Sequence, residues 1–164
     1  MRTRESFLAL YEELEGDMAG MERVLERNKQ AWERIEAGAV SPIDWGALGF
    51  TLHNLYGFLE NYFLRVSKFF ENNLDAERWH KSLVEKMTLE IPGVRPALLG
   101  SERSRFLALE LLKFRHRFRN LYGEDLDPRK TAEIQALAGE FFAGFRGEHA
   151  VFAGKLRAIA DALP

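Results

Sequence analysis

The chain has 164 residues, of which 46% are hydrophobic, 13 of them phenylalanine, and its formal net charge is −2. This length suits one domain, residues 1–164, and the apolar content is enough for a buried core, which excludes a disordered chain. No apolar run approaches the roughly 18 residues that span a bilayer, and the first residues lack the apolar core of a signal peptide. The absence of cysteine excludes disulfides, thiolate nucleophiles and zinc–thiolate sites. We therefore expect a single-domain, cytoplasmic protein.

Apolar residues recur at helical spacing from the beginning of the chain. The first stripe predicts one long helix over residues 1–38, with Gly38 as its stop signal. The segment Ser41-Pro42-Ile43-Asp44 is typical of a helix start, with serine at the N-cap and proline at the first helical position. Aromatic residues widen the stripe of this second helix beyond one face. They predict either a central helix with an aromatic core or a helix that also forms a dimer seam.

Three further helices are expected. The segment Asn72–Asp75 breaks the second pattern, a shorter helix is predicted from Ala76 to Met87, and Pro92–Pro96 reads as a loop. A fourth helix ends at Gly123, and Asp127-Pro128 begins a last long one. The inward stripe of the fourth helix consists of Leu107, Leu111, Phe114, Phe118 and Leu121. With no alternating pattern longer than about four residues, the sequence predicts an all-α, up-and-down helical bundle of four main helices plus a short one.

The fourth helix carries the densest positive charge in the chain. Its basic residues are Arg103, Arg105, Lys113, Arg115, Arg117 and Arg119, and its acidic residues are Glu102 and Glu110. Helical spacing places Arg115 and Arg119 one turn apart, and likewise His116 and Asn120. Guanidinium groups bind phosphate oxygens in bidentate fashion, and an imidazole transfers protons near neutral pH. The pattern indicates a site for a phosphodiester, and a solvated basic helix face is the alternative.

These residues resemble the motif of the HEPN superfamily, and within it that of the HepT-like toxins of prokaryotic toxin–antitoxin pairs. The motif consists of an arginine, a polar residue after it, a histidine a few residues further on, and commonly a tyrosine two residues after that histidine. Arg115, His116 and Tyr122 match the arginine, the polar residue and the tyrosine, whereas Asn120 stands where the histidine is expected.

Upstream, Trp79-His80, Met87 and Ile91–Pro96 are similar to one branch of HepT-like proteins. The resemblance extends roughly from Ile43 to Leu163. It implies a HepT-like core over residues 41–163, with the first helix, residues 1–38, as an added arm.

The resemblance implies a five-helix, HEPN-like bundle that forms a homodimer, so that two copies of the fourth helix build one composite site. It implies metal-independent endoribonuclease activity on tRNA or mRNA, with no cofactor. It also implies a partner, a minimal nucleotidyltransferase antitoxin, which transfers AMP to the motif tyrosine and makes Tyr122 the candidate for AMPylation. The catalytic positions carried over are Arg115, His116 and Asn120, and the expected RNA-phosphate contacts are Lys113, Arg117 and Arg119.

Asn120 leaves two interpretations open, because an amide has no useful pKa near seven. Either His116 takes the acid–base role, or the protein binds RNA without cutting it. The alternatives to a ribonuclease toxin are a non-catalytic HEPN module that presents nucleotide or substrate to a nucleotidyltransferase, and a helical scaffold with a basic surface.

The remaining polar residues have structural interpretations at this level. We expect His53 to be a packing or capping residue and His149 a hydrogen-bonded residue at the core edge, and we leave His80 between a surface or loop-tethering role and catalysis. Glu60 and Asn61 interrupt the stripe of the second helix; a solvated face is the prediction for them, and a position facing the site is the alternative. The spread of the four histidines over four helices argues against a metal site.

Overall fold

The computed structural model of the protein describes residues 2–71 and 79–164. Its helices are α1 (Arg4–Glu36), α2 (Pro42–Phe70), α3 (Trp79–Met87), α4 (Glu102–Arg119) and α5 (Pro128–Ala162). In these ranges the only β-type pairing is an isolated bridge between Ile91 and Arg95. The prediction of an all-α bundle of four main helices plus a short one is confirmed. The predicted break at Asn72–Asp75 and the first three residues of the predicted third helix, 76–78, lie outside the described residues.

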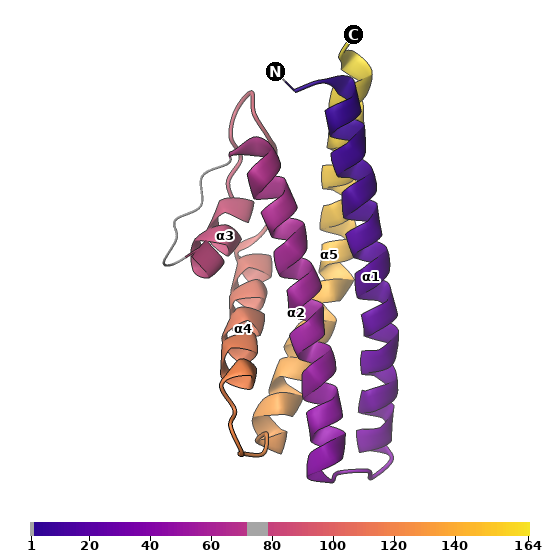
Figure 1. Ribbon diagram of the computed structural model, residues 1–164, viewed down its shortest axis with the longest axis vertical. Helices are drawn as coiled ribbons and strands as arrows, with labels where there is room; N and C mark the ends of the chain where they lie inside the picture. The colour runs from indigo at the N-terminus through magenta and orange to yellow at the C-terminus, as the bar shows by residue number, and fades with distance from the viewer. Residues whose placement is uncertain (1, 72–78) are drawn as a thin grey trace.

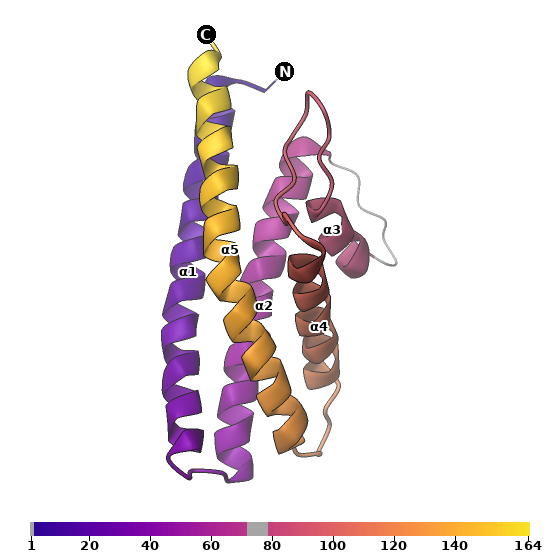
Figure 2. The ribbon, with the colours of Figure 1, turned by 180° about the vertical axis from the view of Figure 1, so that it is seen from behind.

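Helix α2 is the central element of the bundle. It contacts α1, α3, α4 and α5, and Figure 1 shows it between the long α1–α5 pair and the shorter α3 and α4. Seen from behind in Figure 2, α5 crosses from the end of α4 to the side of α1. The two chain termini meet at one end of the molecule and the α1–α2 and α4–α5 connections at the other. The central position of the second helix, one of the two predicted roles, is therefore observed.

The helix starts follow from local side-chain chemistry. The Ser41 hydroxyl accepts a hydrogen bond from the Asp44 backbone N–H, and the Asp44 carboxylate accepts one from the Ser41 backbone N–H, which forms a complete capping box. Asp127 caps α5 by accepting from the backbone N–H of Lys130 at 3.1 Å. Both helix starts agree with the sequence prediction, because capping needs only neighbouring residues.

The end of α4 differs from the prediction. The helix stops at Arg119, with Asn120 as its C-cap, and Gly123 adopts a positive φ of 74° in the turn beyond. The Asn120 side-chain amide donates to the carbonyl of His116 at 2.8 Å and so satisfies one of the last free carbonyls of the helix. Tyr122 consequently lies outside the helix, and its side chain is 85% exposed.

Two buried polar clusters join α1, α2 and α5. Asn28 and Gln135 exchange reciprocal amide hydrogen bonds of 2.8 Å, and the Asn28 amide also donates to the Thr51 hydroxyl. In the second cluster the Nε2–H of His149 donates to the Glu15 carboxylate, and its Nδ1 accepts from the hydroxyl of buried Tyr62. The expectation that His149 is a hydrogen-bonded residue at the core edge is confirmed.

Candidate functional site

The site is built around Arg115, whose side chain extends from α4 across the face of α2. Only 17% of this side chain is exposed, and its Nη2 forms an ion pair with Glu60 Oε1 at 3.4 Å. The guanidinium carbon lies 5.8 Å from the centroid of the Tyr56 ring, close enough for a cation–π contact. Arg115 Nε is buried without a hydrogen-bond partner among the described residues. Arg115 is thus anchored by one carboxylate and retains unused donors.

Gly57 makes room for this guanidinium. A Cβ atom placed on Gly57 would lie 2.9 Å from Arg115 Nη1. The guanidinium, His53, Asn54 and Asn61 line a small hollow at this point on the surface of α2.

Glu60 is buried, and the prediction that it faces solvent is wrong. The residue is 4% exposed because partners from two other helices cover its carboxylate. One oxygen pairs with Arg115 on α4, and the other accepts from His80 on α3 at 2.6 Å. A buried carboxylate is costly unless it is paired and hydrogen-bonded, and both conditions are met here. Asn61, the neighbouring residue, is exposed as predicted.

His80 is held on three sides. Its Nδ1–H donates to Glu60, its ring stacks on Trp79 with centroids 3.7 Å apart, and it meets the ring of His116 edge-on at 5.2 Å. Because the carboxylate accepts the Nδ1–H hydrogen bond, Nδ1 keeps its proton, and Nε2 is left free of this contact. Nε2 has no hydrogen-bond partner in the described part of the chain. His80 therefore tethers α3 to α2 and at the same time belongs to the site.

His116 lies on the exposed side of α4 next to His80. Partial burial, followed by the positive charge of a protonated His80, lowers the pKa of His116 below the ordinary histidine value. Arg119 and Arg115 shift this pKa in the same direction, and Glu60 opposes them. The His116 imidazole is consequently neutral at neutral pH and able to accept a proton.

The basic cluster of α4 divides into a paired and an unpaired half. Arg103 forms two hydrogen bonds of 2.7 Å with Glu140, and Arg105 forms two of 2.6 Å with Glu85. Lys113, an expected phosphate contact, pairs with Glu110 at 2.5 Å on the surface. Arg117 and Arg119 are exposed, and neither forms an ion pair within residues 2–71 and 79–164. The unpaired positive charge is thus concentrated at the C-terminal end of α4, beside Arg115 and His116.

His53 is a packing residue, as predicted. Its ring lies against Phe118 with centroids 5.2 Å apart, and its Nδ1 is buried without a partner among the described residues. Burial, then the positive charges of Arg115 and Arg119, lower the pKa of His53, while Glu60 acts in the opposite direction.

A comparison with protein families places the chain in a family. Residues 47–156 match a family model described as HepT-like protein. The chain belongs to the HepT-like family. The match includes every residue of the site described above, since α2 from Ala47, α3 and α4 all fall inside it, whereas α1 lies outside. Comparisons with curated proteins and with solved structures gave no match.

The HepT-like motif residues have separate positions in this chain. Arg115 and His116 lie together with Glu60 and His80, whereas the Asn120 amide is occupied in capping α4. Tyr122 is in the exposed loop beyond the helix. The resemblance gave Arg115 and His116 as candidate site residues, and the sequence left a catalytic role open for His80. The pairing of His80 with Glu60 has no local sequence signal, because the contact joins two helices and residues 20 positions apart.

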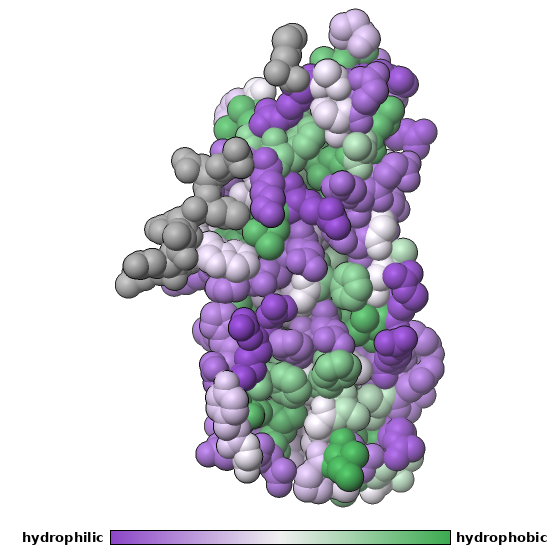
Figure 3. Space-filling model, viewed as in Figure 1, coloured by the Kyte–Doolittle hydropathy of each residue, from purple (hydrophilic) through white to green (hydrophobic). Residues whose placement is uncertain are grey.

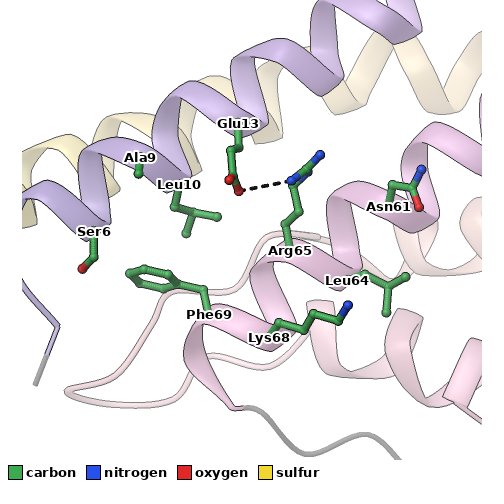
Figure 4. Close-up of a pocket in the computed structure, with 9 residues that line it drawn as sticks. All are labelled: Ser6, Ala9, Leu10, Glu13, Asn61, Leu64, Arg65, Lys68 and Phe69. Atoms are coloured by element: carbon green, nitrogen blue, oxygen red, sulfur yellow. Dashed lines mark ion pairs between the residues drawn. The ribbon is translucent and has the colours of Figure 1, made fainter.

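A second hollow lies further along α2 in this HepT-like protein, on the side of α1. Figure 4 shows Arg65 at its centre, paired with Glu13 at 3.2 Å, while Lys68 and Phe69 form its edge. Arg65 also donates to the buried carboxylate of Asp17 at 2.8 Å. Two carboxylates therefore neutralise Arg65, whereas Arg115 pairs with a single carboxylate that it shares with His80.

Two classes of feature are absent from the described ranges. They contain no group of three histidine, aspartate or glutamate side chains placed to hold a metal ion. None of their helices combines the length and apolarity that a membrane span requires.

Proposed function

We propose that the protein is a metal-independent endoribonuclease of the HepT-like type, acting on tRNA or mRNA. The observation that carries the proposal is the position of Arg115, a half-neutralised cation with unused donors beside the imidazole of His116. Arg117 and Arg119 add unpaired charge at the same end of α4. Membership of the HepT-like family supports this activity.

The proposed chemistry uses the substrate's own nucleophile. Arg115 binds the non-bridging oxygens of a phosphodiester and stabilises the charge that develops on them as the 2′-hydroxyl attacks phosphorus. His116 is neutral at neutral pH and accepts the proton of that hydroxyl. Asn120 does not transfer protons, and its proposed contribution is to hold the last turn of α4 through its bond to the His116 carbonyl. Arg117, Arg119 and Lys113 hold neighbouring phosphates.

The proposed active form is a homodimer that packs through the outer face of α2. This face carries exposed Ile43 and Phe50, the latter 56% exposed, in line with Asn54 and Gly57. Figure 3 shows apolar side chains gathered on the same side of the molecule, over the lower half of α2. Because Arg115 crosses α2 at Gly57, two copies joined along this face bring both Arg115 side chains to one seam.

The proposed regulator is a minimal nucleotidyltransferase antitoxin that AMPylates Tyr122. The phenol is 85% exposed and lies three residues beyond Arg119, off the helix. An adenylate there adds a phosphate and bulk that compete with RNA for the same guanidinium donors. Transfer of AMP to the wild-type chain by the cognate enzyme, absent in Tyr122→Phe, is the expected result. Equal labelling of the two proteins contradicts the assignment.

The test of activity is cleavage of tRNA and total RNA by purified protein in EDTA. Arg115→Ala is expected to reduce the rate on the order of 100-fold, the usual loss when a transition-state donor is removed. Arg103→Ala is the matched control, because Arg103 lies on the same helix and is paired with Glu140 away from the site. Intact RNA with the wild-type protein, or equal cleavage by wild type and Arg115→Ala, contradicts the proposal.

A second candidate function is a non-catalytic HEPN module that binds RNA or nucleotide for a nucleotidyltransferase. The observation that favours it is the use of Asn120 as a helix cap at the motif position of the histidine. RNA that is bound through Arg115 but remains uncut identifies this function.

A further inference from the structure

His80 and Glu60 form a carboxylate–histidine pair beside the proposed phosphate position. The proposed function gives this pair no catalytic role. Glu60 is nearly inaccessible, and its two oxygens divide between Arg115 at 3.4 Å and His80 Nδ1 at 2.6 Å. One carboxylate therefore connects the phosphate-binding guanidinium on α4 with an imidazole on α3. A buried carboxylate that only tied α3 to α2 would not need the arginine of the site as its second partner.

The orientation of the His80 ring suits proton transfer. Trp79 stacks on one face with ring centroids 3.7 Å apart, and Nδ1–H donates its hydrogen bond to Glu60. Nε2 is therefore the ring nitrogen that can exchange a proton with a substrate. The side chain is 25% exposed, which leaves the ring accessible. A general acid or base must be held in this way by a third group to act on a defined atom.

The two imidazoles lie close enough to act on one phosphodiester. The ring centroids of His80 and His116 are 5.2 Å apart, and the rings meet at 84°. The groove beside them is lined by both histidines and by Lys113 and Arg117. Two histidines that flank a phosphate divide the work between them, because one removes the proton of the nucleophile and the other protonates the leaving oxygen.

We propose that His80 is a catalytic residue of this site, the general acid that protonates the leaving 5′-oxygen, with Glu60 as its positioning residue. The inference rests on the proposed ribonuclease activity and deepens it. Asn120 cannot transfer protons, and in this proposal it does not need to, because the second proton-transfer group comes from α3 and not from the end of α4.

The 2′-hydroxyl proton passes to His116 as the 2′-oxygen forms its bond to phosphorus, and the bond from phosphorus to the 5′-oxygen breaks. The electron pair of that bond goes to the 5′-oxygen, which takes the proton from His80 Nε2, while Nδ1–H stays bonded to Glu60. The products are a 2′,3′-cyclic phosphate and a 5′-hydroxyl, and exchange with water restores both rings.

The charged groups around these rings determine their titration. On the helices that pack around them, these groups are Glu60 of α2 and Arg115 and Arg119 of α4. In the groove that both rings line, they are Lys81, Glu85, Lys113 and Arg117. Among the residues that the structure describes, Glu60 is the one carboxylate in direct contact with His80. The acid and base roles are therefore expected as two separate limbs of a bell-shaped pH profile.

The experiment compares His80→Gln and His116→Gln on two RNA substrates, one ordinary and one with sulfur in place of the bridging 5′-oxygen. A thiolate leaves without being protonated, because a thiol is a much stronger acid than an alcohol, with a pKa of about 8.5. On ordinary RNA, His80→Gln is expected to lose on the order of 100-fold in kcat and the alkaline limb of the profile. On the sulfur substrate, His80→Gln is expected to cleave at the wild-type rate, whereas His116→Gln is expected to stay slow.

Glu60→Gln is the second variant and keeps the test decisive if His80→Gln does not fold. An amide cannot accept two charge-assisted contacts as the carboxylate does, so kcat falls on ordinary RNA. The sulfur substrate is expected to restore the part of this loss that comes from His80, and the part that comes from the Arg115 contact remains. Cleavage of ordinary RNA by His80→Gln at the wild-type rate overturns the role of His80 and leaves the ribonuclease activity standing. An equal loss of rate on both substrates, with both limbs of the pH profile intact, does the same. Absence of wild-type cleavage overturns both.

Discussion

Gly57 is the residue on which the position of Arg115 depends most directly. Its missing side chain lets the guanidinium lie across α2, where a Cβ would approach Nη1 to 2.9 Å. We expect Gly57→Ala to displace the end of Arg115 and to reduce RNA cleavage about tenfold or more, because small displacements of catalytic groups are costly. The free energy of unfolding is expected to stay equal or to rise by about 0.5–1 kcal/mol, since alanine favours a helix interior.

Gly46→Ala on the same helix is the control, because nothing lies within 4 Å of the added Cβ. It is expected to gain the same stability and to keep full activity. Equal activity of the two variants would show that Arg115 tolerates the added methyl group and that Gly57 has no part in placing it.

The charge environment of the site is measurable at His53. Because burial and the charges of Arg115 and Arg119 lower its pKa, the contribution of His53 to stability is complete above about pH 6.5 and falls as the pH drops towards the folded-state pKa. An NMR titration of the His53 ring is expected to give a midpoint below the ordinary histidine value. Arg115→Ala is expected to raise this midpoint and Arg103→Ala to leave it unchanged, and no response to Arg115→Ala would contradict the account.

Single residues also show where sequence reasoning stops. Ser41 and Asp127 were predictable as caps because each bonds a backbone group three residues away. The burial of Glu60 was not predictable, because it depends on Arg115 and His80 arriving from two other helices. A charged residue within an apolar stripe has the same sequence pattern whether it ends in solvent or in a site.

At the scale of elements, α1 contributes to the fold without contributing to the site. It lies outside the region matched by the family, and its buried Asn28 bonds to Gln135 on α5 and Thr51 on α2. We expect Asn28→Ala to lower the free energy of unfolding by roughly 1–3 kcal/mol, because Gln135 loses both of its hydrogen bonds to Asn28 and the buried Thr51 hydroxyl loses one of its two. Denaturant unfolding measures this loss, with the exposed Lys29→Ala as the control. A loss no larger than that of the control contradicts the role assigned to this cluster.

The helices themselves were predictable to the extent that their signals are periodic and local. The apolar stripes gave the number and order of the helices, and the aromatic excess of the second stripe correctly indicated a central helix. The end of α4 was misplaced at Gly123, because the helix ends at Arg119 and is capped by Asn120, three residues before Gly123. That difference puts Tyr122 in a loop, where an enzyme can reach it.

At the scale of the whole molecule, the proposed dimer is the feature that the exposed face of α2 supports. We expect Phe50→Glu to prevent dimerisation by placing a charge in the apolar centre of that face, and to abolish cleavage with it. Sedimentation velocity measures the state of assembly. Val151→Glu, at an apolar residue of α5 that is 60% exposed, is the matched control and is expected to remain dimeric and active. Full cleavage by a monomeric Phe50→Glu protein contradicts a composite site.

The chemistry of the RNA ends tests the central claim most directly. If the site cleaves RNA through the 2′-hydroxyl of the substrate, digestion in EDTA leaves a 2′,3′-cyclic phosphate and a 5′-hydroxyl, DNA of the same sequence stays intact, and Arg115→Ala forms these ends on the order of 100-fold more slowly. A 5′-phosphate on the product, cleavage of the DNA, or formation of the same ends by Arg115→Ala at the wild-type rate would contradict the account.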